Sequence, residues 1–79
     1  MDGKIIPLNR LPLGKKARVR ELTLHGISRR RLLDLGLIIN TEVEALQKSP
    51  SGDPIAYLIR GTVIAIRSEE ASEILVEAI

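Results

Sequence analysis

The chain contains no cysteine, phenylalanine or tryptophan, and only one tyrosine and one histidine, Tyr57 and His25. The absence of cysteine excludes disulfides, thiolate metal sites and thiol nucleophiles. The scarcity of aromatic side chains argues against a stacking platform for single-stranded nucleic acid. A lone histidine ahead of Gly26 is a poor basis for a metal site, and we expect it to be solvated. The sequence therefore predicts no cofactor and no metal site within one chain.

Long hydrophobic runs and catalytic motifs are also absent. No segment approaches the roughly 18 apolar residues of a membrane span, and the N-terminus lacks the apolar segment of a signal peptide. We therefore expect a cytoplasmic protein. The sequence has no glycine-rich phosphate loop, and it offers no serine, histidine and aspartate set for nucleophilic catalysis. We expect a binding function with no catalytic residues.

Aliphatic side chains are abundant: 11 isoleucines, 12 leucines and four valines occur among the 79 residues. This content suffices for one compact core, and we expect a single domain spanning residues 1–79. Alternation of apolar and polar residues predicts short strands, with a bulge at Leu46. The predicted extended segments are 5–8, 16–22, 41–48, 55–60, 63–67 and 74–79.

The segments 55–60 and 63–67 are apolar on both faces, which predicts a tight hairpin in the middle of the sheet. A strong turn signal at 49–54, rich in proline, serine and glycine, precedes them. About five strands with one short helix favour a mainly β protein folded as a small closed barrel. Closure is favoured because it removes exposed strand edges.

The clearest helix is predicted at about residues 28–35. Ser28 is a suitable N-cap, and Leu32 and Leu35 lie three residues apart on one face. Gly36 is placed to end the helix in a left-handed conformation. Ile27, just before the cap, is expected to pack as a hydrophobic staple.

A second helical turn is predicted at about 68–73, with Ser68 as its N-cap and acidic residues in its first turn. Together with the first helix it completes the predicted secondary structure. We assign structural roles to Leu32, Leu35, Gly36 and Gly61.

The net charge is only +2, but the charges are unevenly distributed. Residues 1–31 carry a net charge of +7, and the remainder carries −5. Such asymmetry is typical of a basic face that binds an acidic partner, although the solvated face of a strand explains the same charges. The candidate partner-binding residues are Lys15, Lys16, Arg18, Arg29 and Arg30.

Three successive arginines, 29–31, open the predicted helix, where the helix dipole disfavours cations. Successive helical residues point about 100° apart, so the three cannot all face one ligand. Arg31 is expected to lie along the barrel with its stem buried, whereas Arg29 and Arg30 are better placed for outward contacts. Arg30 and Asp34, four residues apart, are also placed to compensate each other.

A series of short motifs resembles the ferrous iron transport protein A (FeoA) family. In order, the motifs are Leu13-Gly14, Ala17-Arg18-Val19, residues 31–37, residues 52–55, Arg60-Gly61, residues 64–67, and Glu70-Ala71 with Ile74 and Val76. The resemblance extends from about Leu8 to Glu77. It implies an SH3-like β-barrel with a short helix, the same barrel as in the C-terminal domain of diphtheria-toxin-repressor-like metal regulators. Where the family commonly has Pro-Gly after the helix, this chain has Ile39-Asn40, and asparagine tolerates a left-handed conformation.

The resemblance also implies a partner. FeoA-like proteins are cytosolic accessories of a ferrous iron permease (FeoB-like), a membrane protein with a GTPase-like cytoplasmic domain. The chain would then approach the membrane only through this permease, and no nucleic acid is expected. Two alternatives stay open: an SH3-like module associated with nucleic acid or metal regulators, and an assembly in which metal bridges several chains.

Overall fold

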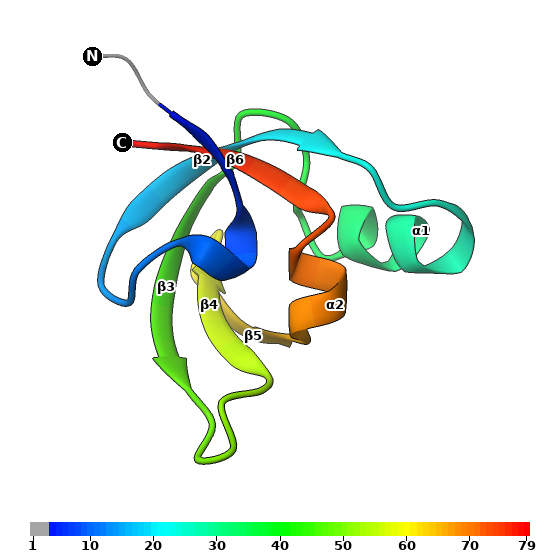
Figure 1. Cartoon of the computed structure of the whole chain (residues 1–79). Coiled ribbons are helices and arrows are strands. Elements are labelled where there is room, and N and C mark those ends of the chain that lie inside the picture. Colours follow the sequence, from blue (N-terminus) through cyan, green and yellow to red (C-terminus); the bar gives the residue numbers. More distant parts are fainter. Residues whose placement is uncertain (1–3) are drawn as a thin grey trace.

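The computed structural model describes residues 4–79, which form six strands, two short α-helices and one 3-10 turn (Figure 1). The strands are β1 (Ile5–Pro7), β2 (Lys16–Leu22), β3 (Glu42–Lys48), β4 (Ile55–Ile59), β5 (Thr62–Ile66) and β6 (Ile74–Ala78). The helices are α1 (Gly26–Asp34) and α2 (Ser68–Ala71), and the 3-10 turn is η1 (Leu8–Arg10). The structure is mainly β, as predicted, and β1 corresponds to the short extended segment expected at 5–8.

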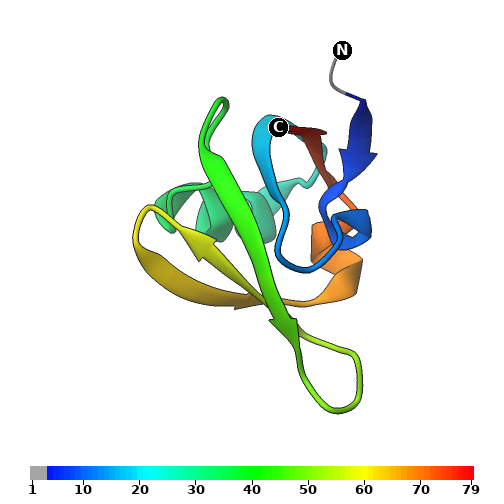
Figure 2. The same ribbon diagram turned by 90° about the vertical axis from the view of Figure 1, so that its left-hand side faces the viewer.

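The strands form one antiparallel sheet in the order β1-β6-β2-β3-β4-β5, which curls around the core (Figures 1 and 2). Among the described residues the order begins at β1 and ends at β5, with no pairing between these two strands. The expected full closure of the barrel is therefore wrong. The expectation that the β4–β5 hairpin lies in the middle of the sheet is also wrong, because β5 is an edge strand whose outer face is exposed.

The core consists mainly of the inward residues of the strands, to which the helices and the connecting segments add Leu8, Leu11, Leu24, Leu32, Leu37 and Ala71. Val43 and Ala45 are fully buried, as the alternation predicts, and the register of β3 against β4 shifts between Ala45 and Gln47, which places the predicted bulge at Leu46. The single aromatic residue belongs to this core. The Tyr57 hydroxyl donates a hydrogen bond to the Leu8 carbonyl at 3.3 Å. Burial, together with the carboxylate of Asp53, raises the pKa of Tyr57 to about 12.

Helix α1 begins two residues before the predicted start. His25 occupies the N-cap position and makes no side-chain cap, so the prediction of Ser28 as N-cap is wrong. The chain enters the helix through Gly26, whose φ of +65° suits glycine. Ile27 is 87% exposed, so it forms no hydrophobic staple. Leu35, expected to share the buried face with Leu32, is 38% exposed.

The C-terminal end of α1 is closed by backbone hydrogen bonds from Leu37 to Leu32 and from Gly36 to Leu33. These are the two bonds of a Schellman motif, which requires a left-handed residue, and Gly36 has a φ of +105°. A Cβ atom at Gly36 would lie 2.8 Å from Cδ of Arg60. Asn40 has a φ of 75°, so the turn into β3 is left-handed without glycine.

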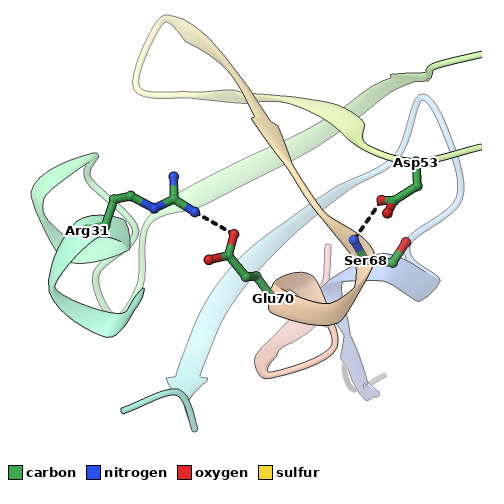
Figure 3. A network of polar contacts seen from close by, with 4 residues as sticks. All are labelled: Arg31, Asp53, Ser68 and Glu70. Atoms are coloured by element: carbon green, nitrogen blue, oxygen red, sulfur yellow. Dashed lines mark hydrogen bonds and ion pairs between the residues drawn. The ribbon is translucent and has the colours of Figure 1, made fainter. Parts of the chain in front are cut away.

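Helix α2 is capped by a residue that is distant in the sequence. Arg67 occupies the N-cap position without a side-chain bond, so Ser68 is not the cap that the sequence predicts. Instead, the backbone N–H of Ser68 donates to Oδ1 of Asp53 at 2.8 Å (Figure 3). Asp53 lies in the turn before β4, and its carboxylate meets the positive end of α2. This contact connects the 49–54 turn to the second helix.

Candidate docking surface

The basic side chains of β2 are largely compensated by acidic residues on the neighbouring strands. Lys16 Nζ lies 3.7 Å from Oε2 of Glu42 on β3, and Arg20 Nε lies 3.0 Å from Oε1 of Glu77 on β6. Arg20 also donates to Oδ1 of Asn40 at 3.2 Å. Strand β2 lies between β3 and β6, and both neighbours present carboxylates to it. Two of the cations on β2 are therefore balanced by carboxylates from the later, acidic part of the chain.

Arg18 lies in the same row, and its register partners are Glu42 on β3 and Glu77 on β6. Lys15 is exposed just before β2. The Lys16 end of β2 lies on the opposite side of the molecule from α1 (Figure 1). The five predicted partner-binding residues thus fall into two groups, one along β2 and one on α1, and they do not form one surface.

Two of the three successive arginines make contacts within the fold. Arg29 donates from NH1 to the Leu22 carbonyl at 2.8 Å, which anchors α1 to the end of β2. Arg31 pairs through NH2 with Oε1 of Glu70, which connects α1 to α2 (Figure 3). Arg31 is therefore held by a carboxylate of α2, where the sequence predicted packing of its stem along the barrel. Arg29 was expected to contact a partner, but its side chain instead donates to the backbone of the same chain.

Arg30 is the arginine of this run that keeps its charge available. Within residues 4–79 it has neither an ion pair nor a side-chain hydrogen bond, and the expected compensation by Asp34 is not formed. Its side chain is exposed on α1. Of the predicted binding residues on the helix, Arg30 is therefore the one free to contact a partner.

A shallow groove of about 350 Å³ runs along the outer face of α1. Its lining residues recur at the spacing of one helix face: Ile27, Arg30, Arg31, Asp34 and Leu35. Ile27 and Leu35 supply the apolar surface, and Arg30 and Arg31 border it. Neither Ile27 nor Leu35 was a predicted binding residue. The helical spacing of Ile27 and Leu35 could have indicated this face. Apolar residues at such a spacing are usually assigned to the core, so the sequence did not identify them as binding residues.

Residues 4–79 contain no group of three or more histidine, cysteine, aspartate or glutamate side chains placed to hold a metal ion. His25 is exposed at the start of α1. Neither described helix has the length and apolar character that a membrane-spanning segment needs.

A curled antiparallel sheet with a short helix beside it defines the class of SH3-like barrels, small domains that present binding surfaces on their exterior. Residues 6–78 match the family model of the FeoA domain. The chain therefore belongs to the FeoA family, whose members are ferrous iron transport accessory proteins and not a known class of enzymes. The family resemblance and the barrel that it implied are confirmed.

Named relatives agree with this assignment. The Fe(2+) transport protein A/Fe(2+) transporter FeoB fusion protein of Porphyromonas gingivalis is 31% identical over 72 residues, which cover 91% of this chain and 8% of the fusion protein. The FeoA structure from Chlorobium tepidum is 34% identical, with a TM-score of 0.89 over 94% of this chain and 70% of that one. FeoA of Stenotrophomonas maltophilia, complexed with zinc and described as a prokaryotic SH3 domain protein, is 32% identical, with a TM-score of 0.76 over 96% of this chain and 88% of that one.

The fold also occurs in a manganese-dependent transcriptional repressor, 15% identical with a TM-score of 0.86, and in IdeR. IdeR of T. acidophilum is 22% identical, with a TM-score of 0.80, and the match covers 95% of this chain and 34% of IdeR. At this identity the likeness shows the fold alone. It confirms the expected similarity to the barrel of repressor-type proteins.

Proposed function

We propose that this chain is a non-enzymatic, cytosolic accessory of ferrous iron uptake that docks on the cytoplasmic part of a FeoB-like permease. The observation that carries the proposal is the fusion protein of Porphyromonas gingivalis, whose name joins an FeoA-like part and an FeoB transporter in one polypeptide. Covalent linkage holds two parts at a high effective concentration, which favours even a weak contact between them. A docking surface is therefore expected on the exterior of this barrel.

The groove on α1 is the surface best suited to this docking. Ile27 exposes 87% of its surface, and burying such a side chain releases about 25 cal/mol for each Å² of apolar area. Arg30 borders the groove with no partner among the described residues, so a carboxylate of the permease can pair with it. An apolar side chain between Ile27 and Leu35, with an acidic residue beside Arg30, would match both the shape and the charge of the groove.

The test is a titration of the isotope-labelled chain with the purified permease in detergent and with its isolated cytoplasmic domain. We expect binding at low salt and chemical-shift changes on α1. Arg30→Glu should weaken binding by about tenfold or more, because it places a like charge opposite the partner's carboxylate. Arg10→Glu is the matched control, since Arg10 is an exposed arginine on η1, and this variant should bind nearly as well as the unmodified chain.

Two results would contradict the proposal. One is the absence of binding to both permease preparations at low salt, together with normal ferrous iron uptake in a strain that lacks this chain. The other result tests only the location of the docking surface. If Arg30→Glu and Ile27→Asp both bind as well as the unmodified chain, α1 is not part of that surface.

The ion pairs of β2 weigh against the nucleic-acid alternative. A phosphate backbone requires several uncompensated cations, whereas Lys16 and Arg20 already contact carboxylates. Phosphate-driven binding is strongest at low salt, so a gel-shift experiment at about 50 mM salt is the most sensitive test. We expect no shift with double-stranded or single-stranded DNA under this condition, and a clear shift would favour the alternative.

A further inference from the structure

The edge of the sheet at β5 presents unpaired backbone groups. Arg60 and Gly61 have φ values of 52° and 81°, and the register pairs Ile59 with Thr62 across them. Positive φ at both central residues is typical of a two-residue type I′ turn, whose closing pair is hydrogen-bonded. Hydrogen-bonded pairs then recur at every second residue of β5. Consequently, the backbone groups of Val63 and Ala65 point away from β4.

These outward groups are accessible. Within residues 4–79 neither Val63 nor Ala65 makes a backbone hydrogen bond outside the sheet. Val63 is 61% exposed, and Ala65 is exposed as well. Their cross-strand neighbours on the same outer face, Leu58 and Ala56, are half-buried. A second strand placed beside β5 would therefore find two donors, two acceptors and an apolar face.

The two edges of the sheet differ in how they are protected. Natural edge strands are usually short, or they carry charged residues or proline that prevent pairing with another chain. Strand β1 fits this rule, since it has three residues and ends in Pro7. Strand β5 has five residues, Thr-Val-Ile-Ala-Ile, with neither charge nor proline. The edge at β5 thus lacks the protection that the opposite edge has.

Arginines flank the unprotected edge. Arg60 lies in the turn before β5 and Arg67 directly after it, and both are exposed. Neither forms an ion pair within the part of the chain that the structure describes. The five residues of β5 between the turn and Arg67 span about 17 Å. Next to Arg67, a groove of about 420 Å³ is lined by Pro54 and Ala65, and on its α2 side by Glu69 and by Glu70 with its partner Arg31.

We propose that the β5 edge binds an extended segment of a partner protein, which adds a strand to the sheet and carries a carboxylate near each end. The free backbone groups of Val63 and Ala65 would hold its main chain, and Arg60 and Arg67 would select the acidic residues. Alternating apolar side chains would pack beside Val63 and Ala65. None of Val63, Ala65, Arg60 and Arg67 lines the α1 groove, although Arg31 lies at the border of both grooves. The proposed strand addition therefore does not depend on the docking proposed at Ile27 and Arg30.

A second copy of this chain is a poorer occupant. Antiparallel pairing of two β5 strands about Ile64 would bring Arg60 of each copy beside Arg67 of the other. Like charges would then meet at both ends of the added strand, which is unfavourable for pairing. Charge thus favours an acidic segment of a different protein over self-association.

The probe is a blocked peptide, Asp-Thr-Val-Thr-Val-Thr-Val-Asp, titrated into the isotope-labelled full chain and followed by NMR. We expect the largest chemical-shift changes at the amides of Val63 and Ala65, with slower hydrogen exchange at both. A peptide with lysine in place of both aspartates should bind about tenfold more weakly at low salt. Raising sodium chloride from about 50 mM to about 500 mM should reduce this difference, because salt screens exposed charges.

Variants separate the backbone contact from the charges. Val63→Pro removes an outward N–H without touching the bonds to β4, and it should weaken binding by about tenfold or more, since proline is tolerated only where a strand needs no donor. Val63→Thr is the matched control, because it keeps the N–H and the β-branched shape, and it should bind the peptide nearly normally. Arg67→Glu should favour the lysine-flanked peptide, whereas Arg10→Glu on η1 should change neither affinity.

Several outcomes would overturn the proposal. Equal affinity of the aspartate and lysine peptides would exclude selection by Arg60 and Arg67, and shifts confined to other elements would exclude the edge. A dimer of the chain alone in sedimentation, dissociated by Val63→Pro, would identify a second copy as the occupant. Arg30→Glu should leave peptide binding unchanged, so a failure of permease docking and a failure of the edge proposal are distinguishable.

Discussion

Strand β2 and helix α1 are the two basic regions of this protein, and they use their charges differently. On β2, Lys16 and Arg20 lie beside carboxylates of β3 and β6. On α1, Arg29 and Arg31 are held by groups of the same chain, whereas Arg30 borders an apolar groove without a partner among the described residues. Equal density of positive charge in a sequence therefore does not mean equal availability to a ligand. Availability depends on which neighbours the sheet supplies.

The largest predicted effect separates the two faces of α1. Leu32 is fully buried, so Leu32→Ala should lower the free energy of unfolding by about 2–5 kcal/mol through lost transfer energy and the cavity that remains. Leu35→Ala, at a site that is 38% exposed, should cost less than about 1 kcal/mol. Urea unfolding of both variants measures the difference. Equal losses would mean that the outer face of α1 also contributes to the core.

The second largest effect concerns the core beneath these charged surfaces, and unfolding at alkaline pH tests it through the buried Tyr57 hydroxyl. Since the pKa of Tyr57 is raised to about 12, the folded state holds the phenol proton more tightly than the unfolded chain, whose pKa is about 10. This contribution to stability is intact below pH 10 and is lost as the pH rises toward 12, by about 1.4 kcal/mol for each pH unit. Tyr57→Phe should show a shallower loss in urea unfolding between these pH values. Equal slopes would contradict the role of the buried phenol.

Adjacent arginines on α1 provide a narrower comparison. Arg29→Ala removes the hydrogen bond to the Leu22 carbonyl and should lower the free energy of unfolding by about 1 kcal/mol. Arg30→Ala removes a side chain without such a contact among residues 4–79 and should change stability by less than about 0.5 kcal/mol. Thermal unfolding of the two variants checks the difference. An equal or larger loss for Arg30→Ala would place Arg30 in the fold and remove it from the docking surface.

The smallest predicted effect concerns β2. The Arg20–Glu77 pair is partly exposed to solvent, so its coupling energy should be below about 1 kcal/mol and should decrease at high salt. A double-mutant cycle with Arg20→Gln and Glu77→Gln measures it. Although the energy is small, Glu77→Gln should increase the positive potential of β2. Weak binding of DNA by this variant, but not by the unmodified chain, would show that the carboxylates keep β2 from acting as a basic surface.

Much of the fold could be predicted from local patterns. Alternation located β2 and β3, runs of apolar residues located β4 and β5, and the slip of the alternation at Leu46 located the bulge. The left-handed turn at Asn40 also follows from local preference, because few other residues tolerate that conformation. Such features are predictable because they depend on residues that are close together in the sequence.

Other features required contacts between distant residues. The cap of α2 comes from Asp53, fifteen residues before Ser68, so the local signal at Ser68 was misleading. Ile27 and Leu35 have the spacing of a buried helix face, but α1 turns this face outward. Likewise, apolar residues on both faces of β5 indicated a central strand, whereas the sheet order places it at the edge. For α1 and β5, the apolar pattern shows that a surface can be buried, but it does not show which part of the protein covers that surface.

The sequence by itself determined the class of this protein: a small, cysteine-free β domain with one principal helix and the ordered motifs of the FeoA family. Only the tertiary structure decided which of its cations are free. Arg30 and the arginines that flank β5 keep their charges available within the described residues, whereas Lys16 and Arg20 do not. The physical reason is that pairing of charges depends on distances of a few ångström, and those distances are set by strand order and register rather than by position along the chain.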